Sequence, residues 1–322
     1  MNLDTRMHAT HYKILSLLSA LLLVMAASGA YARSLNGFDL DDVLVKRKLI
    51  RSGGPPRDGI PSIDSPRFVE AGEADYLADS DRVLGVVIDG VTKAYPVKIL
   101  NYHEIVNDYF GDVPVTVTFC PLCGTGIAFD AVVDGQARQF GVSGLLYNSD
   151  VLMYDRQTES LWSQILAQAI SGPARGQKLR LLPVRHTTWA DWRKRYPETR
   201  VLAEPRGFGR NYDVDPYVGY ATSNRLWAPV AHKDRRYPRK SVVVGVIVNG
   251  AAHAWPFSEL PEDGQVVVDT VGGQTVRLQY DHATRSAAVL DTNGREIPSF
   301  TAFWFAWVAF HPDTGVYKGD RG

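Results

Sequence analysis

Cys120 and Cys123 are the residues whose type and spacing point most directly to chemistry, and they are the two cysteines of the 322-residue chain. A C-x-x-C pair acts as a redox dithiol or supplies two ligands of a metal site. Gly124 and Gly126 follow, before a short apolar run, and this order predicts a turn that leads into a strand. Since a thioredoxin-like site needs a helix there, the sequence favours a metal-binding knuckle.

The knuckle supplies only two ligands, and His103 is the first candidate for a third. A neutral imidazole combines well with thiolates on zinc, copper or iron. Packing or capping beside Glu104 is the structural alternative for this histidine. Copper is the preferred ion, because a two-thiolate site suits Cu(I). Zinc or iron is possible, although a structural site for either asks for a fourth ligand and the chain has no second cysteine pair.

His186 and His311 are the next candidate ligands. His186 stands just before Trp189 and Trp192, whose spacing predicts the first turn of a helix. His311 closes an aromatic run from Phe300 that fits one helical stripe. Such stripes are usually core, so a structural role is the alternative for both histidines.

An internal repeat indicates the fold. Residues 84–96 align position by position with residues 244–256, and the similarity continues more weakly to about residues 130 and 291. Asp-Gly at 89–90 and Asn-Gly at 249–250 are typical of the type I′ turn of a β-hairpin. We therefore predict a β-rich α+β fold, with two related antiparallel β-sheet units (about 83–130 and 243–291) and a few helices between and after them.

The two copies differ where the cysteines stand. The first copy carries Cys120 and Cys123, whereas the second has residues 281–285 (Asp-His-Ala-Thr-Arg) at that place. His103 also belongs to a segment, 101–107, that the second copy replaces with a different sequence. The chemistry is thus predicted to lie in the first copy.

Between the copies, residues 143–164 are dense in polar side chains with a period of neither 2 nor 3.6. This pattern is typical of a cavity lining or a hydrogen-bonded loop. Asp155 and Glu159 are candidates for acid and base, but an Asp155–Arg156 neighbour pair more often indicates a structural ion pair. Ser143 lacks the final glycine of a G-x-S-x-G elbow, which argues against a hydrolase.

The N-terminus predicts export. Arg6 and Lys13 precede the apolar run 14–27, and Ala30-Tyr31-Ala32 is an A-x-A cleavage signal. We expect a signal peptide over residues 1–32, with cleavage after Ala32, and a single periplasmic or secreted domain over residues 33–322. An uncleaved anchor is the alternative. No later apolar run approaches the length of a membrane span.

Charge and composition exclude some partners. Lys plus Arg and Asp plus Glu number 35 each, so the net charge gives no indication of nucleic-acid binding. The basic run 232–240 contains Pro and Asp, as a solvated loop does. A large exported domain needs no disulfide framework. A Cys120–Cys123 disulfide would close too short a loop to stabilise much.

Several motifs together resemble one exported bacterial and archaeal family, the domain of unknown function DUF3179. They are the run from Ala94 through His103 to Asp108, the C-P-L-C-G turn, residues 141–150, residues 161–164 and the aromatic run ending in His311-Pro312. The resemblance covers nearly all of the expected mature chain. It implies one continuous domain across both repeats, and it implies no activity.

The sequence thus predicts an exported metal-binding protein with copper at a C-x-x-C-centred site. If the protein is an enzyme, an oxidoreductase is the favoured class, with residues 143–164 as the substrate wall. Two alternatives stay open, a metal-free thiol-disulfide oxidoreductase and a non-catalytic binding module with a small disulfide clip. The partner is an unknown small molecule or protein, and nucleic acid is not expected.

Overall fold

The computed structural model describes residues 34–319, which form mainly antiparallel strands with three short α-helices. The prediction of a β-rich fold with few helices is confirmed. The expected signal peptide lies outside the described residues. Over residues 34–319, no helix has both the length and the apolar character needed to cross a membrane.

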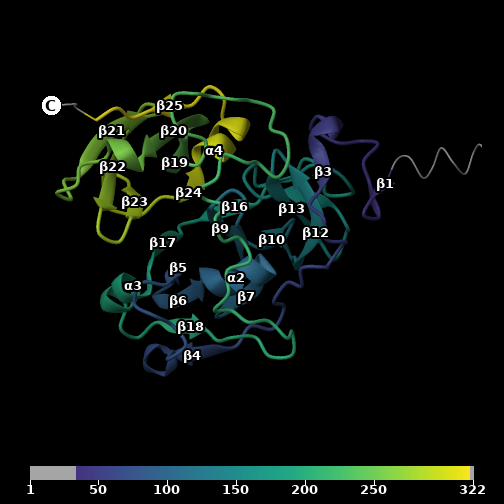
Figure 1. The fold of residues 1–322 in the computed structure, drawn as a ribbon, viewed down its shortest axis with the longest axis horizontal. Coiled ribbons are helices and arrows are strands. Elements are labelled where there is room, and N and C mark those ends of the chain that lie inside the picture. The colour runs from purple at the N-terminus through teal and green to yellow at the C-terminus, as the bar shows by residue number, and fades with distance from the viewer. Residues whose placement is uncertain (1–33, 320–322) are drawn as a thin grey trace, which may run out of the picture.

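Five sheets of three or more strands lie next to one another like the blades of a β-propeller (Figure 1). Two sheets contain the first copy of the repeat. In spatial order, β17 (Arg185–Thr188), β5 (Arg82–Ile88), β6 (Val91–Pro96), β18 (Arg200–Leu202) and β4 (Phe68–Glu70) form one, and β16 (Arg180–Leu182), β9 (Thr125–Asp130), β8 (Val113–Cys120) and β7 (Ile105–Phe110) form the other. A third sheet consists of β15 (Gln168–Ala169), β14 (Leu161–Ser163), β13 (Asp150–Asp155), β12 (Phe140–Tyr147) and β3 (Ile50–Ser52), and the two sheets of the second copy are β24 (Ser299–Phe303), β19 (Val242–Val248), β20 (Ala251–Pro256) and β25 (Gly315–Val316), and β21 (Val267–Val271), β22 (Gln274–Asp281) and β23 (Ser286–Leu290).

Smaller elements complete the described chain. They are the two-stranded sheets β1 (Ser34–Leu35) with β2 (Phe38–Asp39) and β10 (Val132–Val133) with β11 (Gln136–Ala137), the helices α2 (Val97–His103), α3 (Trp189–Arg195) and α4 (Trp304–Phe310), and the 3-10 turns η1 (Arg47–Leu49), η2 (Ala71–Glu73) and η3 (Phe257–Glu259).

The prediction of one sheet unit per repeat was wrong. In the first copy the β5–β6 hairpin lies in one sheet and β7, β8 and β9 lie in another. The second copy is divided in the same way, with β19–β20 in one sheet and β21, β22 and β23 in the next. Each hairpin ends at a proline, Pro96 or Pro256, and a helical turn begins at the next residue. Because proline has no N–H for a further ladder bond, the strand stops there and the chain leaves the sheet.

Both hairpin turns have the predicted geometry. The φ angles are 49° and 80° at Asp89 and Gly90, and 49° and 80° at Asn249 and Gly250. Positive φ at both central residues is the requirement of a type I′ turn. The dipeptides therefore fix the register of β5 against β6 and of β19 against β20.

A further correspondence follows each copy. Along the chain, α3 lies between β17, which pairs antiparallel with β5, and β18, which pairs parallel with β6. In the same way, α4 lies between β24, which pairs antiparallel with β19, and β25, which pairs parallel with β20. On α3, Trp192 lies so close to Gly85 that a β-carbon there would be 2.2 Å from the ring. On α4, Trp307 covers Gly245 in the same way, at 2.1 Å. Each indole nitrogen donates over 2.9 Å to a threonine seven residues later.

Two helix predictions need correction. The aromatic run is a strand from Ser299 to Phe303, and α4 begins only at Trp304. His186 lies inside strand β17 rather than in the turn that enters α3. The apolar pattern of residues 299–303 suits a helix or a strand, and residues 185–188 carry no apolar pattern. Pairing with the edge of an existing hairpin, β19 or β5, decides for the strand.

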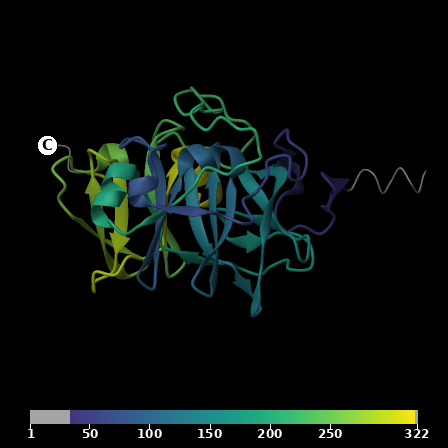
Figure 2. The same ribbon diagram turned by 90° about the horizontal axis from the view of Figure 1, so that it is seen from below.

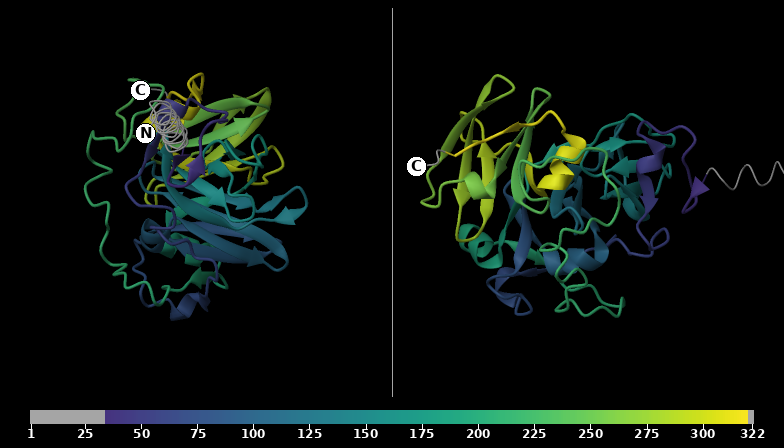
Figure 3. Two further views of the ribbon diagram at one scale, coloured as in Figure 1. Left: turned by 90° about the vertical axis from the view of Figure 1, so that its right-hand side faces the viewer. Right: turned by 45° about the horizontal axis from the view of Figure 1, so that its top comes forward.

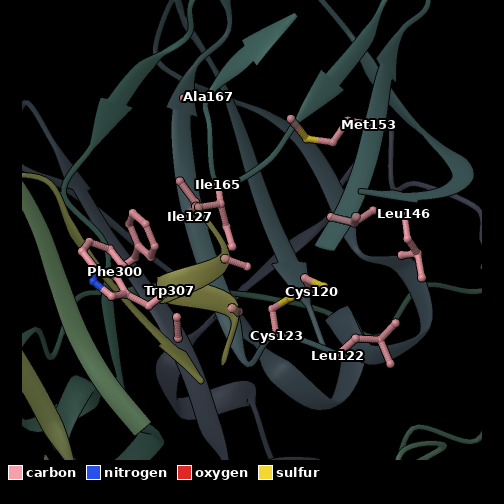
Figure 4. Close-up of a cluster of buried hydrophobic side chains, with 14 of the residues drawn as sticks. Cys120, Leu122, Cys123, Ile127, Leu146, Met153, Ile165, Ala167, Phe300 and Trp307 are labelled. Carbon is pink, nitrogen blue, oxygen red and sulfur yellow. The ribbon is translucent and has the colours of Figure 1, made fainter. Parts of the chain in front are cut away.

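The first half of the fold, with β5 to β9 and β17 and β18, meets the second half, with β19 to β25, through these edge strands. β17 lies against β23 of the second half, and β24 lies against β9 of the first. His186 Nδ1 and Thr301 Oγ1 are 2.9 Å apart across the contact between β17 and β24. The largest apolar core also spans this contact, and it includes both cysteines with Phe300 and Trp307 (Figure 4).

A long segment without helix or strand, residues 203–241, connects β18 to β19, and we call it the strap. It is the green trace that runs along the outside of the sheets, at the top of Figure 2 and along the left edge of the left panel of Figure 3. Loops of this length in a compact domain are uncommon and are often functional.

Candidate metal site at the cysteine turn

The cysteine turn links β8 to β9, as the sequence predicts. Cys120 ends β8 and pairs with Thr125 at the start of β9, and the Cys123 N–H donates to the Cys120 carbonyl over 3.1 Å. Gly124 completes the reversal at a φ of 61°. Both thiols are reduced and buried, with exposed fractions of 1% and 0%. Figure 4 shows the two sulfur atoms side by side within the core.

Asp150 brings a carboxylate to these sulfurs. Among residues 34–319, Cys120, Cys123 and Asp150 form the group of three metal-ligating side chains whose ligand atoms all lie within 4.8 Å of one another. One carboxylate oxygen of Asp150 accepts from the Ile165 N–H over 3.2 Å. The other, Oδ1, is buried and has no hydrogen-bond partner in the described part of the chain. The Cys120 and Cys123 thiols interact with this carboxylate, so its oxygens and the two sulfurs are placed to share one ligand.

The β12–β13 turn determines where Asp150 lies. Asn148 and Ser149 form its two central residues, with φ angles of 53° and 68°. The Cys123 thiol donates to the Ser149 carbonyl over 3.3 Å. Strap residues Ala228 and Ala231 donate their N–H groups to the Ser149 hydroxyl and the Asn148 carboxamide. The turn is thus held between the cysteines and the strap.

Burial raises the pKa of every acid in this cluster. It raises that of the Asp150 carboxyl to about 7 and, with the Asp150 charge, that of the buried Glu104 carboxyl to about 8. Burial likewise raises the pKa of the Cys120 thiol, and that of Cys123 well above its ordinary value. Neither carboxylate forms an ion pair among the described residues. A bound cation would therefore remove a large desolvation penalty.

One cation lies close to the cluster. Lys240, at the end of the strap, interacts electrostatically with Cys123, yet burial lowers the pKa of its amine to about 8. Its Nζ donates to the Tyr220 carbonyl over 2.8 Å and lies 3.2 Å from the centre of the Tyr220 ring. A single, partly desolvated lysine does not balance two carboxyls and two thiols.

The structure places His103 outside the group of three. Its Nδ1 is 2.7 Å from the Pro61 carbonyl oxygen, and its Nε2 is 2.8 Å from the Tyr212 hydroxyl. Both ring nitrogens thus have partners, and His103 links α2 to the strap. The next residue, Glu104, is the one from this segment that interacts electrostatically with Cys120 and Asp150.

His186 and His311 also lie apart from the group of three. His186 contacts the Phe119 ring and bonds Thr301, and its Nε2 has no partner in residues 34–319. His311 stacks on Trp307 with ring centres 4.4 Å apart, the separation that Tyr196 has from Trp192 in the first half. His311 therefore takes the place of Tyr196 in the second half of the fold.

The polar segment 143–164 is an internal hydrogen-bond network. Asp155 accepts from Trp162 Nε1 and from the backbone and hydroxyl of Thr158. Glu159 pairs instead with Arg57. Ser143 donates to the Leu152 carbonyl.

The ion pairs of this segment are not the neighbour pair that the sequence suggested. Arg156 pairs with Asp58 and Asp64 rather than with Asp155. Gln164 reaches the cysteine hairpin, donating to the Thr118 hydroxyl over 2.8 Å. The segment thus contacts the cysteine hairpin through Gln164.

Sequence reasoning missed three parts of the site. Asp150 lies 27 residues beyond Cys123, in a polar stretch that offers no ligand spacing. Glu104, rather than its neighbour His103, brings its side-chain charge near Cys120 and Asp150. The strap carries Tyr217 and Tyr220, whose hydroxyl pKa values are raised by burial and by charge on Glu104 and the cysteines. The absence of periodicity between β18 and β19 was the signal for a covering loop.

Comparison with known proteins places the chain in a family. Residues 57–314 match the family model described as "Protein of unknown function (DUF3179)". The chain belongs to the DUF3179 family. The match covers both halves of the fold and the whole strap, so the resemblance seen in the sequence motifs is confirmed. No curated protein and no solved structure matches this DUF3179 chain.

Proposed function

We propose that this DUF3179 protein is an exported metal-binding protein in which Cys120, Cys123 and Asp150 hold one metal ion. The observation that carries the proposal is the convergence of two sulfurs and a carboxylate within 4.8 Å, with one carboxylate oxygen lacking a partner. The cleavage signal at Ala32 supports export. The ligands come from two turns, β8–β9 and β12–β13, that are tied to each other and to the strap.

The donor set bears on which ion is bound. Two thiolates alone suit Cu(I), which is why the sequence favours copper. A carboxylate is a harder donor, and two thiolates with one carboxylate carry three negative charges when deprotonated. This combination suits a borderline divalent ion, with zinc first and iron possible. Copper stays a candidate that the same measurement identifies.

The number of protein ligands determines which reactions the bound ion could perform. Three protein ligands leave an open position on a tetrahedral ion, as catalytic zinc sites do and closed structural sites do not. With copper or iron the site would suit an oxidoreductase. With zinc it would suit polarisation of a bound water or carbonyl. We propose an enzyme only in this conditional sense, since the ion decides the class.

The environment of the thiols weighs against metal-free exchange. A thiol-disulfide oxidoreductase needs an accessible cysteine with a lowered pKa. Burial has the opposite effect here, because it raises the pKa of both thiols and removes them from solvent. A protein with a mere disulfide clip would have no use for the unpartnered Asp150 oxygen. Both alternatives predict equal, trace metal in all variants below.

The test is the metal content of the full exported chain, purified without immobilised-metal resin and measured by mass spectrometry. We expect about one equivalent of metal in the wild type. Asp150→Asn keeps the shape of the side chain but removes the charge, and it should lower metal affinity by about 10-fold or more in a chelator competition. Cys120→Ser/Cys123→Ser should abolish binding.

His103→Gln is the matched variant, because it tests the third ligand that the sequence suggested. We expect it to keep its metal, since His103 bonds Pro61 and Tyr212. Loss of metal in His103→Gln with retention in Asp150→Asn would reverse the ligand assignment. Trace metal throughout would refute the metal-binding proposal. Circular dichroism of each variant verifies that the fold persists.

A further inference from the structure

A cavity of about 370 Å³ lies where the two halves of the fold meet. Pro121 and Gly124 of the cysteine turn line it from the first half, and Thr301 and Arg285 line it from the second. Aromatic rings form much of the remaining wall, namely Phe119, Tyr217, Tyr220, Phe257 and Phe303. This size and apolar lining are typical of a pocket for a small molecule.

Two arginines line this cavity without a carboxylate partner. Arg82 donates to the carbonyl oxygens of Thr284, His186 and Arg285, which fix its guanidinium at the wall. Within residues 34–319, neither Arg82 nor Arg285 forms an ion pair. Burial, together with the charge of Arg285, lowers the pKa of Arg82 to about 10. Asp191 acts on Arg82 through its charge but pairs directly with Arg195, so an anion in the cavity would offset more of the cost of burying the guanidinium.

The acid in the lining does not supply this charge. Asp215 lies on the strap, where it accepts from the Asn101 carboxamide over 3.2 Å and from the Tyr217 N–H over 2.9 Å. It thus serves to hold the strap to α2. Arg82 and Arg285 are the cationic groups of the lining, and Asp215 keeps its negative charge at the strap.

Two further polar atoms of the lining residues have no partner in the described chain. They are His186 Nε2 and the Tyr220 hydroxyl, both shielded from solvent. Nδ1 of the same imidazole is engaged by Thr301, so only Nε2 is left for a ligand. Two such atoms in the wall of one cavity are available to pair with a ligand.

We propose that this cavity binds a small organic carboxylate with an aromatic body. Its carboxylate pairs with Arg82 and Arg285, as guanidinium groups recognise planar anions. Its ring packs among the aromatic side chains. A polar substituent on the ring meets His186 or Tyr220. The ligand then lies against the cysteine turn, but its binding needs no metal and goes beyond the function proposed above.

Benzoate is the probe, titrated calorimetrically into the full chain as purified. We expect saturable binding at one site. Arg285→Gln should weaken it by about 10-fold or more, because a charge-assisted bond is lost. Arg82→Gln should do the same. Arg285 is exposed, so its variant keeps the fold even if Arg82→Gln does not.

Arg185→Gln is the matched control, because Arg185 neighbours His186 on β17 but pairs with Glu296 and does not line the cavity. It should bind benzoate as the wild type does. Benzyl alcohol, which has the ring without the charge, should bind about 10-fold more weakly than benzoate.

Three results would overturn the inference. They are no benzoate binding by the wild type, wild-type affinity in Arg285→Gln, and equal affinity for benzyl alcohol and benzoate. Cys120→Ser/Cys123→Ser separates the two proposals. If the metal proposal fails, this variant and the wild type still bind benzoate equally. If the carboxylate proposal fails, metal content is unaffected.

Discussion

The turn after β8 and the turn after β22 occupy equivalent places in the two halves of the fold, yet only the first carries cysteines. Cys120 pairs with Thr125 as Asp281 pairs with Ser286, and Gly124 and Arg285 both have positive φ. In the second half, Asp281 accepts from the Thr284 N–H and the turn is exposed. In the first half the turn is buried beneath the strap. The same scaffold therefore gives a solvated turn or a buried one, depending on what covers it.

The largest expected difference concerns metal. Cys120→Ser/Cys123→Ser should lose all bound metal, whereas the same change at the equivalent positions, Asp281→Ser/Thr284→Ser, should lose none. The reason is that, among residues 34–319, two sulfurs and a carboxylate lie within 4.8 Å of one another at the first turn, whereas the second turn has no cysteine. Mass spectrometry of both double variants, prepared side by side, measures this. Equal losses would mean that the effect is one of stability.

The next largest effect is on stability. Trp192→Ala and Trp307→Ala each remove a fully buried indole that lies on a glycine, so each should lower the free energy of unfolding by about 3–5 kcal/mol. Denaturant titration measures both. Trp307 shares a core with Cys123 and Trp192 does not, so only Trp307→Ala should also weaken metal binding. Equal metal affinity in the two variants would separate the site from that core.

Low pH should weaken the packing of His311 on Trp307 but not that of Tyr196 on Trp192. Burial lowers the pKa of the His311 imidazole to about 4 from an ordinary value of 6.5. The folded state thus favours the neutral ring, and this stability is present above pH 6.5 and is lost as the pH falls toward 4. His311→Tyr, which copies Tyr196, should reduce the acid-induced loss by on the order of 2 kcal/mol.

The reciprocal variant is the control for this prediction. Tyr196→His should add an acid-dependent loss to the first half, because its ring would stack on Trp192 as His311 does on Trp307. Denaturant midpoints at pH 7 and pH 4 measure both changes. Identical pH dependence in His311→Tyr and the wild type would contradict the assigned role of the buried histidine.

The smallest effect should be the same in both halves. Gly90→Ala and Gly250→Ala each place a β-carbon at a φ of 80°, where nothing lies within 4 Å to clash. Each should cost about 1 kcal/mol from backbone conformation alone. Thermal unfolding of the two variants measures it. A loss in one copy only would indicate that the hairpins are not equivalent.

Local chemistry explains which parts could be predicted. Asp-Gly and Asn-Gly specify their turns through backbone preference, and two glycines after Cys120 and Cys123 specify a reversal, so these elements follow from neighbouring residues. Asp150 could not be found in this way, because it reaches the cysteines through strand pairing and a turn with two positive φ angles. The pairing of β24 with β19 likewise decides residues 299–303 against a helix.

The repeat extends to a second sequence pattern, in the segments that carry α3 and α4. Residues 189–201 and 304–316 share the pattern W-x-x-W, then Tyr or His, Pro, an acid and Thr. This pattern places His311 opposite Tyr196 and indicates a packing role for it. The division of each copy between two sheets, in contrast, depends on how the chain leaves Pro96 and Pro256, which a pattern of apolar residues does not encode.

The strap bears on how long a ligand would stay at the cysteine turn rather than on how tightly it would bind. Tyr212 ties it to His103 at one place, and Ala228 and Ala231 tie it to the β12–β13 turn at another. Anything held at the cysteine turn beneath it would leave only when these bonds open together. Its residence time would then follow the frequency of that local opening, which hydrogen exchange at the strap amides reports. A protein built in this way would release its cargo slowly, or when a partner lifts the strap.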